Sequence, residues 1–555
     1  MPSSVLCPPS SVLPAASPGF GPPSSVLRPP SSVLRPLSSL FPWLLAAASG
    51  LLLAAVFAPF NQHDATWFAL VPLLVALKFV PARRLFLLGF SAGAACWLVS
   101  LFWLTRVTAF GWFGLSLYCA LYLGVFAWLV GLRIQRVGTL TVRNNLGTMA
   151  LAAAGWGGLE YLRSILATGF PWNPLAASQH HNVAVLQVCA WGGAYALSAL
   201  IVWVNAGVAL TFLRYIECRG RWGRRPHAEL IFGFLLLAGA FMLGWSAWGR
   251  AAPPGPVLRA AVVQTDIPQD EKWDRAKIEL IYRRLRELTR GAVLTAPHLV
   301  IWPETALPDD VRSSPASYDL VYQLATSGVP LLVGSMDSVW PDAGPPTYYN
   351  CSFLFDGDGA IVGEYRKRHL VPFGEYVPLR HVLPFLKAMT PIEASFTGGH
   401  TSTVFRLPGS ELPFGALICF EDTVASLARE AVQNGARLLI NQTNDAWFDP
   451  WWAQWQHMAH SILRAVENGV PVIRCANSGV SCFIDARGRV VEVLERDGQV
   501  RFPGYVTGEL ALPGPDFQPT FYTRHGDLFA RTCVFVVLLA AWSALRLRRA
   551  TPIAP

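Results

Sequence analysis

Long apolar segments dominate the first half of the chain, and one more lies near its end. They cover about 40–59, 64–80, 85–105, 111–132, 147–166, 184–213, 229–249 and 528–546. Each is close to the roughly 20 residues that an α-helix needs to cross a bilayer. The segment at 184–213 is longer, which favours a tilted helix or an extra turn. The pattern therefore predicts an α-helical membrane bundle of about eight spans.

Between 250 and 527 the pattern changes to short β-rich runs that alternate with amphipathic segments. The β-rich runs are 260–267, 298–304, 330–336, 416–421, 437–443 and 471–478. Apolar residues at helical spacing occupy 277–289 and 453–468, and a hairpin at 351–365 turns on Asp-Gly-Asp-Gly. This alternation predicts an α/β or mixed sandwich domain that is joined to membrane spans at both ends.

The amino-acid composition is that of a membrane protein, and the N-terminal residues differ in composition from the rest of the chain. Hydrophobic residues make up 53% of the chain and charged residues only 14%, whereas soluble proteins carry about 25% charged residues. The motif PSSVL recurs four times within residues 1–39, and such a Pro/Ser repeat cannot bury a core. We expect a disordered extension without function at 1–39, seven spans at 40–249, the α/β domain at 250–527, and a last span with a cytoplasmic tail at 528–555.

Arginine is concentrated in every second loop between the apolar segments. The arginines of these loops are Arg83, Arg84, Arg133, Arg136, Arg143, Arg214, Arg219, Arg221, Arg224, Arg225, Arg546, Arg548 and Arg549. Because positive loops stay in the cytoplasm, both termini are predicted there, with 250–527 on the outer side. The net charge of +9 is thus explained by topology, and we expect no nucleic-acid partner.

The cysteines and histidines predict no metal site and no redox motif. The ten cysteines include no CxxC pair, and His369 has no partner at metal-ligand spacing. Four cysteines, Cys351, Cys419, Cys475 and Cys482, lie within 250–527, and whether two of them form a disulfide stays open. No cofactor is expected.

Three residues with complementary chemistry stand at the ends of predicted strands. Glu304 closes HLVIWPE, Lys367 follows the hairpin, and Cys419 closes ALIC. Cys419 could be an ordinary buried thiol. A glutamate could instead take the thiol proton while a lysine stabilises the thiolate and an oxyanion. Together the three residues predict acyl-transfer chemistry.

The segments around these residues resemble the catalytic segments of the nitrilase superfamily, which has a Glu-Lys-Cys triad on an αββα sandwich. The segments are WPETALP (302–308), YRKRHLVPFGEYVP (365–378) and CFED (419–422). The spans and further motifs narrow the resemblance to the apolipoprotein N-acyltransferase family over about 40–546. Those motifs are EKW (271–273), TGFPWN (168–173), NDAWF (444–448) and HSILRAVENGVPVIRCANSG (460–479).

This resemblance implies a role for each matching residue. Glu304 would be the general base, Lys367 the oxyanion-stabilising residue and Cys419 the acyl-accepting nucleophile. Glu375 and Glu421 would orient Lys367 and the substrate amine. The residues implied near the acyl or lipoprotein pocket are Trp273, Trp447 and Arg474, although the two tryptophans could equally be core aromatics.

The implied activity moves an acyl chain from a glycerophospholipid, through a Cys419 thioester, to the N-terminal diacylglyceryl cysteine of an apolipoprotein. The enzyme would be a monomer in a bacterial inner membrane, with its catalytic domain in the periplasm. The alternatives are a membrane-tethered nitrilase-like amidase or lipid hydrolase with the same triad, and a transporter with a degenerate domain. Glu160 and Arg163 are expected to form an ion pair or to line a headgroup site. The stretch 379–389 is expected to be a lid or a surface helix.

Overall fold

The computed structural model describes residues 31–138, 141–217, 227–249, 255–342, 344–377, 395–448 and 452–550. Most of the PSSVL repeat and the stretch 379–389 lie outside these residues. The chain divides into two units, 1–41 and 42–555, and all sheets belong to the second. Helix α1 (Ser31–Ala55) includes nine residues that the sequence assigned to the disordered extension. The helix extends past the expected boundary at 39, since a helix that is already formed extends at little cost, and the division of the chain at 39 stays a prediction.

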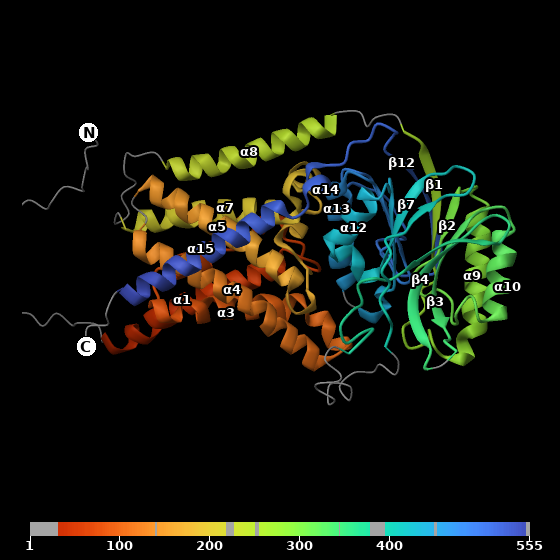
Figure 1. The fold of residues 1–555 in the computed structure, drawn as a ribbon. Helices are drawn as coiled ribbons and strands as arrows, with labels where there is room; N and C mark the ends of the chain where they lie inside the picture. The colour runs from red at the N-terminus through yellow and green to blue at the C-terminus, as the bar shows by residue number, and fades with distance from the viewer. Residues whose placement is uncertain are drawn as a thin grey trace, which may run out of the picture. The chain divides into compact units, whose positions relative to one another are not determined.

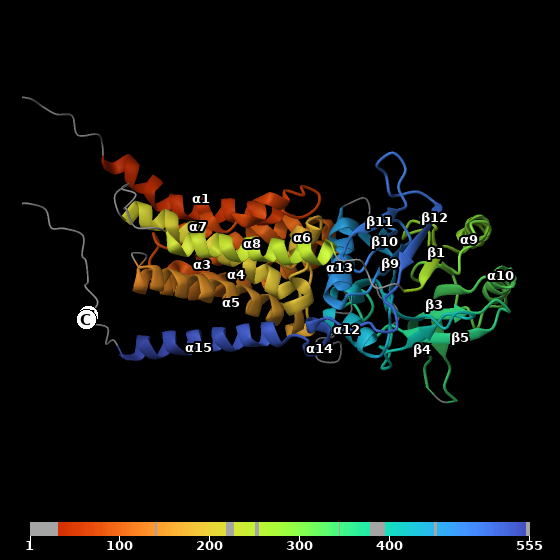
Figure 2. The same cartoon turned by 90° about the horizontal axis from the view of Figure 1, so that it is seen from above.

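Long helices run side by side in the membrane part of the second unit (Figures 1 and 2). They are α3 (Leu85–Ser100), α4 (Ala109–Val137), α5 (Val142–Ile165), α7 (Cys189–Glu217), α8 (Ala228–Gly249) and α15 (Leu528–Ala550). Within the described residues, four stretches are long and apolar enough to cross a membrane: Ala82–Ser100, Ala109–Val137, Cys189–Glu217 and Ala228–Ser246. These four stretches identify a membrane protein.

The count of about eight spans is not confirmed. The span expected at 64–80 consists instead of the 3₁₀ helix η1 (His63–Trp67) and the short α2 (Val71–Ala76). Pro72 stands at the start of α2, where it cannot continue a preceding helix. At 1.5 Å per residue these pieces are shorter than the roughly 30 Å hydrocarbon core. The segment expected at 184–213 is divided into α6 (Val183–Leu186) and α7.

The remainder of the second unit contains two six-stranded sheets. Their strand orders are β12-β1-β2-β3-β4-β5 and β11-β10-β9-β8-β7-β6. The strands of the first sheet are β1 (Val257–Gln264), β2 (Leu299–Ile301), β3 (Leu331–Val339), β4 (Thr347–Phe355), β5 (Ile361–Arg366) and β12 (Gly504–Ala511). Those of the second are β6 (Val404–Arg406), β7 (Pro413–Ile418), β8 (Leu439–Thr443), β9 (Val472–Ala476), β10 (Cys482–Ile484) and β11 (Val490–Val493). The expected hairpin is β4–β5.

Side chains that alternate between the two faces of each strand explain how the sheets and helices of this domain are layered. In β1, Leu258, Ala260 and Val262 pack between the two sheets, whereas Ala261 and Val263 pack beneath the helices of the outer layer. The helices of this layer are α9 (Ile278–Val293) and α10 (Pro315–Ala325), and α12 (Ala425–Gln433) and α13 (Ala453–Asn468) cover the second sheet (Figure 1). A strand that is buried on both faces reads as a continuous apolar run. The predicted αββα sandwich is confirmed.

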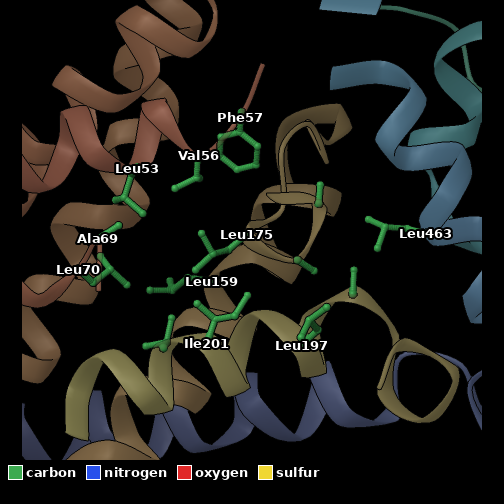
Figure 3. Close-up of a cluster of buried hydrophobic side chains, with 14 of the residues drawn as sticks. Leu53, Val56, Phe57, Ala69, Leu70, Leu159, Leu175, Leu197, Ile201 and Leu463 are labelled. Atoms are coloured by element: carbon green, nitrogen blue, oxygen red, sulfur yellow. The ribbon is translucent and has the colours of Figure 1, made fainter. Parts of the chain in front are cut away.

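The layer formed by α12 and α13 also packs on the membrane part. One apolar cluster joins Ile462, Leu463 and Val466 of α13 to Leu197 and Ile201 of α7. Figure 3 shows part of this cluster, with Leu463 of α13 beside the side chains of the membrane segments. The second sheet therefore presents its helices, and the turn after β7, to the membrane bundle.

Candidate active site

The three candidate catalytic residues follow three different strands. Cys419 comes directly after β7 and opens the 3₁₀ helix η7 (Cys419–Thr423). Its φ of 53° lies in the left-handed region, a strained conformation for a residue with a Cβ. Glu304 follows β2 and Lys367 follows β5. Their exposed fractions are 9% for Cys419, 6% for Glu304 and 1% for Lys367, so the fold removes all three from bulk water.

Lys367 forms the centre of a buried polar group. Its Nζ lies 3.1 Å from Glu304 Oε1 and 2.9 Å from Glu375 Oε1. Asn350 Nδ2 donates to the same two oxygens, at 2.8 and 3.1 Å. Glu375 thus contacts Lys367, the residue that it is predicted to orient. Two carboxylates hold one ammonium group in place, and Asn350 fixes both carboxylates.

The charges of this group follow from its contacts. Burial raises the pKa of Glu304, but the Lys367 and Lys272 ammonium groups outweigh burial and lower that pKa overall. Burial lowers the pKa of Lys367, yet Glu304 and Glu375 outweigh it and raise that pKa well above its ordinary value. At neutral pH Glu304 is thus a carboxylate that can accept a proton, and Lys367 is a fixed positive charge.

The thiol of Cys419 is protonated at rest. Burial, and then the Glu304 carboxylate, raise the pKa of Cys419 well above its usual range, while Lys367 only partly opposes them. A thiol is a poor nucleophile until its proton leaves. Attack by Cys419 therefore requires proton transfer to a base during the reaction, and Glu304 has the required charge state.

Glu421 ties the cysteine turn to the segment that carries Lys367. Its carboxylate accepts hydrogen bonds from the backbone N–H groups of Ile418 (2.8 Å), Arg368 (2.6 Å) and His369 (3.0 Å). It also accepts one from the Tyr365 hydroxyl at 2.9 Å. Glu421 thus bonds to the residue after Lys367 and to the residue before Cys419, and orients Lys367 through the backbone.

A second buried network lies behind the cysteine turn. Arg474 is fully buried and donates to Asp422 Oδ2 at 3.2 Å and to Asp445. His457 places Nε2 2.8 Å from Asp422 Oδ1 and Nδ1 2.8 Å from Asp445 Oδ1. This placement favours a positioning role for Arg474, which reaches no surface open to a substrate. Trp273 and Trp447 are 45% and 42% exposed, and their contact with substrate stays a prediction.

The charged network around His457 should make the folded protein less stable at high pH. Burial lowers the pKa of His457, but Asp422 and Asp445 outweigh it and raise the pKa to about 9. The unfolded pKa is about 6.5, so the stabilisation is complete below that pH and disappears as pH rises through about 9. We expect His457→Gln to cost about 1–3 kcal/mol at pH 7 and less at pH 10.

Apparent melting temperatures of the detergent-solubilised protein between pH 6 and 10 measure this effect. The exposed His400 supplies the matched control, His400→Gln, which should follow the wild type throughout. An equal destabilisation by His457→Gln at both ends of the pH range would show that His457 contributes packing and no charge.

Aromatic residues of the membrane segments pack against the turn that carries Cys419. Phe420 stacks on Trp172, with ring centroids 6.1 Å apart and planes at 4°. Gln456 Oε1 of α13 accepts from Trp172 Nε1 at 2.8 Å and from Trp103 Nε1 at 3.3 Å. The sequence motif TGFPWN therefore belongs to the wall that supports Phe420, the neighbour of the candidate nucleophile.

One expectation about a polar pair changes, and one open question about the cysteines is answered. The ion pair expected between Glu160 and Arg163 is not formed. Glu160 Oε1 accepts from the Leu175 N–H at 2.7 Å, and Arg163 donates to the carbonyls of Phe170 and Trp172, both at 2.7 Å. The two residues brace the 170–175 segment, because its backbone offers nearby partners. The eight cysteines within the described residues are free, so no disulfide joins Cys351, Cys475 or Cys482.

Two residues of the site were not predicted. Asn350 precedes the expected hairpin and showed no signal in the sequence. Lys272 donates to the backbone carbonyl of Glu304 at 3.0 Å, and burial lowers its pKa to about 8. It lies within the EKW motif and is one of few lysines in the chain, a signal that could have identified it.

Known proteins match both halves of the chain. Residues 259–501 match the carbon-nitrogen hydrolase family, and residues 49–207 match the apolipoprotein N-acyltransferase N-terminal domain. An apolipoprotein N-acyltransferase of Geobacter metallireducens is 34% identical over 91% of this chain and 95% of its own. One of Gloeobacter violaceus is 32% identical over 89% and 92%. The solved structure of yeast Nit3, a nitrilase-superfamily member, is 19% identical over 50% of this chain and 97% of its own, at a TM-score of 0.34.

Proposed function

Because the chain belongs to the apolipoprotein N-acyltransferase family, we propose that it transfers a phospholipid acyl chain to a lipoprotein through a thioester on Cys419. It is an acyltransferase of lipoprotein maturation. The observation that carries the proposed mechanism is the buried Glu304–Lys367 ion pair at 3.1 Å, whose charges act on a strained Cys419. The alternative of an amidase or lipid hydrolase receives no support from the relatives.

The first half-reaction acylates the enzyme. Cys419 Sγ attacks the ester carbonyl of a glycerophospholipid, and its proton moves to the Glu304 carboxylate. The Lys367 ammonium stabilises the oxyanion that forms. When the intermediate collapses, the C–O bond breaks and Glu304 returns the proton to the leaving lysophospholipid oxygen. The products are a Cys419 thioester and a lysophospholipid.

The second half-reaction releases the acyl chain to the acceptor. The α-amine of the N-terminal diacylglyceryl cysteine attacks the thioester and gives its proton to Glu304. Collapse forms the amide, breaks the C–S bond and returns the proton to Cys419 Sγ. Both half-reactions use one base and one fixed cation, and the two substrates occupy the site in turn. Glu375 and Asn350 keep Lys367 and Glu304 in register throughout.

The membrane supplies both substrates. We place residues 250–527 in the periplasm on the strength of the arginine-rich loops. The bacterial inner membrane and the monomeric state follow from the resemblance to the family. The packing of α13 on α7 supports a site close to the lipid surface. The acyl donor and the diacylglyceryl anchor of the acceptor are both insoluble in water, so such a site would meet them within the bilayer.

The experiment that tests this function is mass spectrometry of a reporter lipoprotein in cells depleted of the protein. The N-terminal peptide should carry three acyl chains before depletion and two after it. Re-expression of the wild-type chain should restore the third chain. A peptide that stays triacylated after depletion would contradict the proposal.

The arginine distribution predicts the orientation of the domain. Alkaline phosphatase fused after residue 300 should be active, since it folds only outside the cytoplasm. The same fusion after residue 222 should be inactive, because that loop carries the largest arginine cluster. Enzyme assays on whole cells measure both, and the reverse pattern would place the site on the wrong side for lipoprotein substrates.

A further inference from the structure

Three histidines from two distant loops meet outside the catalytic group. His63 opens η1, and His180 and His181 follow the 3₁₀ helix η5 (Leu175–Gln179). One ring nitrogen of each lies within 4.8 Å of the other two. The rings of His63 and His181 have centroids 4.5 Å apart, and those of His180 and His181 are 3.9 Å apart. Nothing in the proposed acyl transfer uses these three side chains.

Backbone carbonyls fix the tautomers of two of the rings. His63 Nδ1 lies 2.8 Å from the Ser178 carbonyl oxygen, and His180 Nδ1 lies 3.0 Å from that of Ala177. A carbonyl can only accept, so each Nδ1 carries the proton and each Nε2 keeps its lone pair. A carbonyl behind the other ring nitrogen is the usual outer contact of a metal-binding histidine.

The loops that hold the histidines are also joined by groups other than the rings. Gln179 Nε2 donates to the His63 carbonyl at 3.0 Å, and Thr66 Oγ1 donates to Ser178 Oγ at 2.9 Å. The His63 ring is therefore one of several links between the loops, and the rings of His180 and His181 are not needed to bring them together. If they served only as packing, apolar side chains would fill the same space without three polar nitrogens facing one another.

We propose that His63, His180 and His181 bind one divalent transition-metal ion of the Zn²⁺ type. Three neutral imidazoles suit Zn²⁺, Cu²⁺ or Ni²⁺ rather than Mg²⁺ or Ca²⁺, which require oxygen ligands. His180 is buried, His63 is half-buried and His181 is exposed, so an ion can reach the three rings from the side of His181. Exposed His181 is free to rotate into the closer spacing, about 3.4 Å between nitrogens, that follows from Zn–N bonds near 2.1 Å.

The ion would stiffen the support of the catalytic turn. Binding cross-links the loop after α1 to the 170–182 segment, which also carries Trp172, whose ring stacks on Phe420 beside Cys419. The loop after α1 also reaches α13, because the Ala58 carbonyl accepts from Gln456 Nε2 at 2.8 Å. The metal is thus a structural tie on the wall of the site, and the acyl-transfer chemistry does not depend on it.

Zinc binding to the full-length, tag-free protein in detergent tests the proposal. After treatment with a chelator and its removal, calorimetric titration with Zn²⁺ should give one site per chain, and Mg²⁺ should give none. His181→Ala, at an exposed position, should weaken Zn²⁺ binding at least about 10-fold. The pair His63→Gln and His181→Ala should abolish it, whereas the exposed control His400→Ala should bind as the wild type does.

Two outcomes would overturn the metal site. One is the absence of stoichiometric zinc binding by the wild type, and the other is unchanged binding by the double variant. Acylation of Cys419 by phospholipid is measured on the same samples and should persist in all variants. A failure of the metal site is therefore distinguishable from a failure of the proposed function.

Discussion

Replacing Cys419 by Ala is expected to abolish acyl transfer, with turnover reduced at least about 10⁴-fold. Alanine lacks the sulfur on which the proposed thioester would form, the thiol whose charge state Glu304 and Lys367 both influence. Cys419→Ser should also turn over poorly, because an alkoxide is harder to form than a thiolate with the same base. Transfer of a labelled acyl chain from phospholipid to a diacylglyceryl peptide measures both variants.

Cys351→Ala is the matched control for this loss. Cys351 is a buried free thiol in β4 whose side chain packs under the outer helices. The Cys351→Ala enzyme should keep most of its activity, because the substitution removes only one small buried group from the packing of the domain. Turnover by Cys419→Ala that approaches that of Cys351→Ala would rule out a thioester on Cys419.

Replacing Glu304 by Gln should slow acylation of Cys419 by about 10²–10⁴-fold. The amide keeps the shape of the carboxylate but cannot take the thiol proton. It also leaves the Lys367 charge opposed by Glu375 alone. The folded state should survive, since Asn350 and Lys367 still find partners in Glu375. Single-turnover formation of the acyl-enzyme isolates this step from release to the acceptor.

The exposed Glu492 of β11 provides the control, Glu492→Gln, which should acylate at the wild-type rate. Melting temperatures of the two variants should show that both are folded. A Glu304→Gln enzyme that acylates as fast as Glu492→Gln would mean that another group takes the proton.

Local pattern was enough to predict most of the fold. Strands such as β1 and β7 are apolar on both faces, and such runs are visible without coordinates. The span expected at 64–80 is not formed as one helix. Hydropathy alone takes no account of Pro72, which stands at the start of a new short helix, or of the polar residue His63 at the start of the preceding one. Helix α1 begins before the apolar segment that identified it, since nothing in that segment specifies where the helix starts.

Site residues could be predicted from the sequence where the chemistry of a residue and a motif point to the same position. They could not be predicted where their role depends on contacts between elements that are far apart in the sequence. Glu304, Lys367 and Cys419 stand at strand ends, so their residue types suggested a function. Asn350 lies within a strand, and its two hydrogen bonds to carboxylates depend on β4 and β5 being paired. The three histidines are brought together only by the packing of two loops that are far apart in the sequence. The motif around Arg474 implied a place near a substrate pocket. In the structure Arg474 pairs with two aspartates from other elements, and the motif alone could not show this pairing.

Intact-mass measurement of the purified enzyme after incubation with phospholipid alone tests whether Cys419 accepts the acyl chain. We expect a mass gain of one acyl chain, mapped to the peptide that contains Cys419 and released by neutral hydroxylamine, as a thioester is. A diacylglyceryl peptide should then discharge the adduct much faster than water does. An adduct that also forms on the Cys419→Ala enzyme, or that maps to Cys351, Cys475 or Cys482, would show that Cys419 is not the nucleophile.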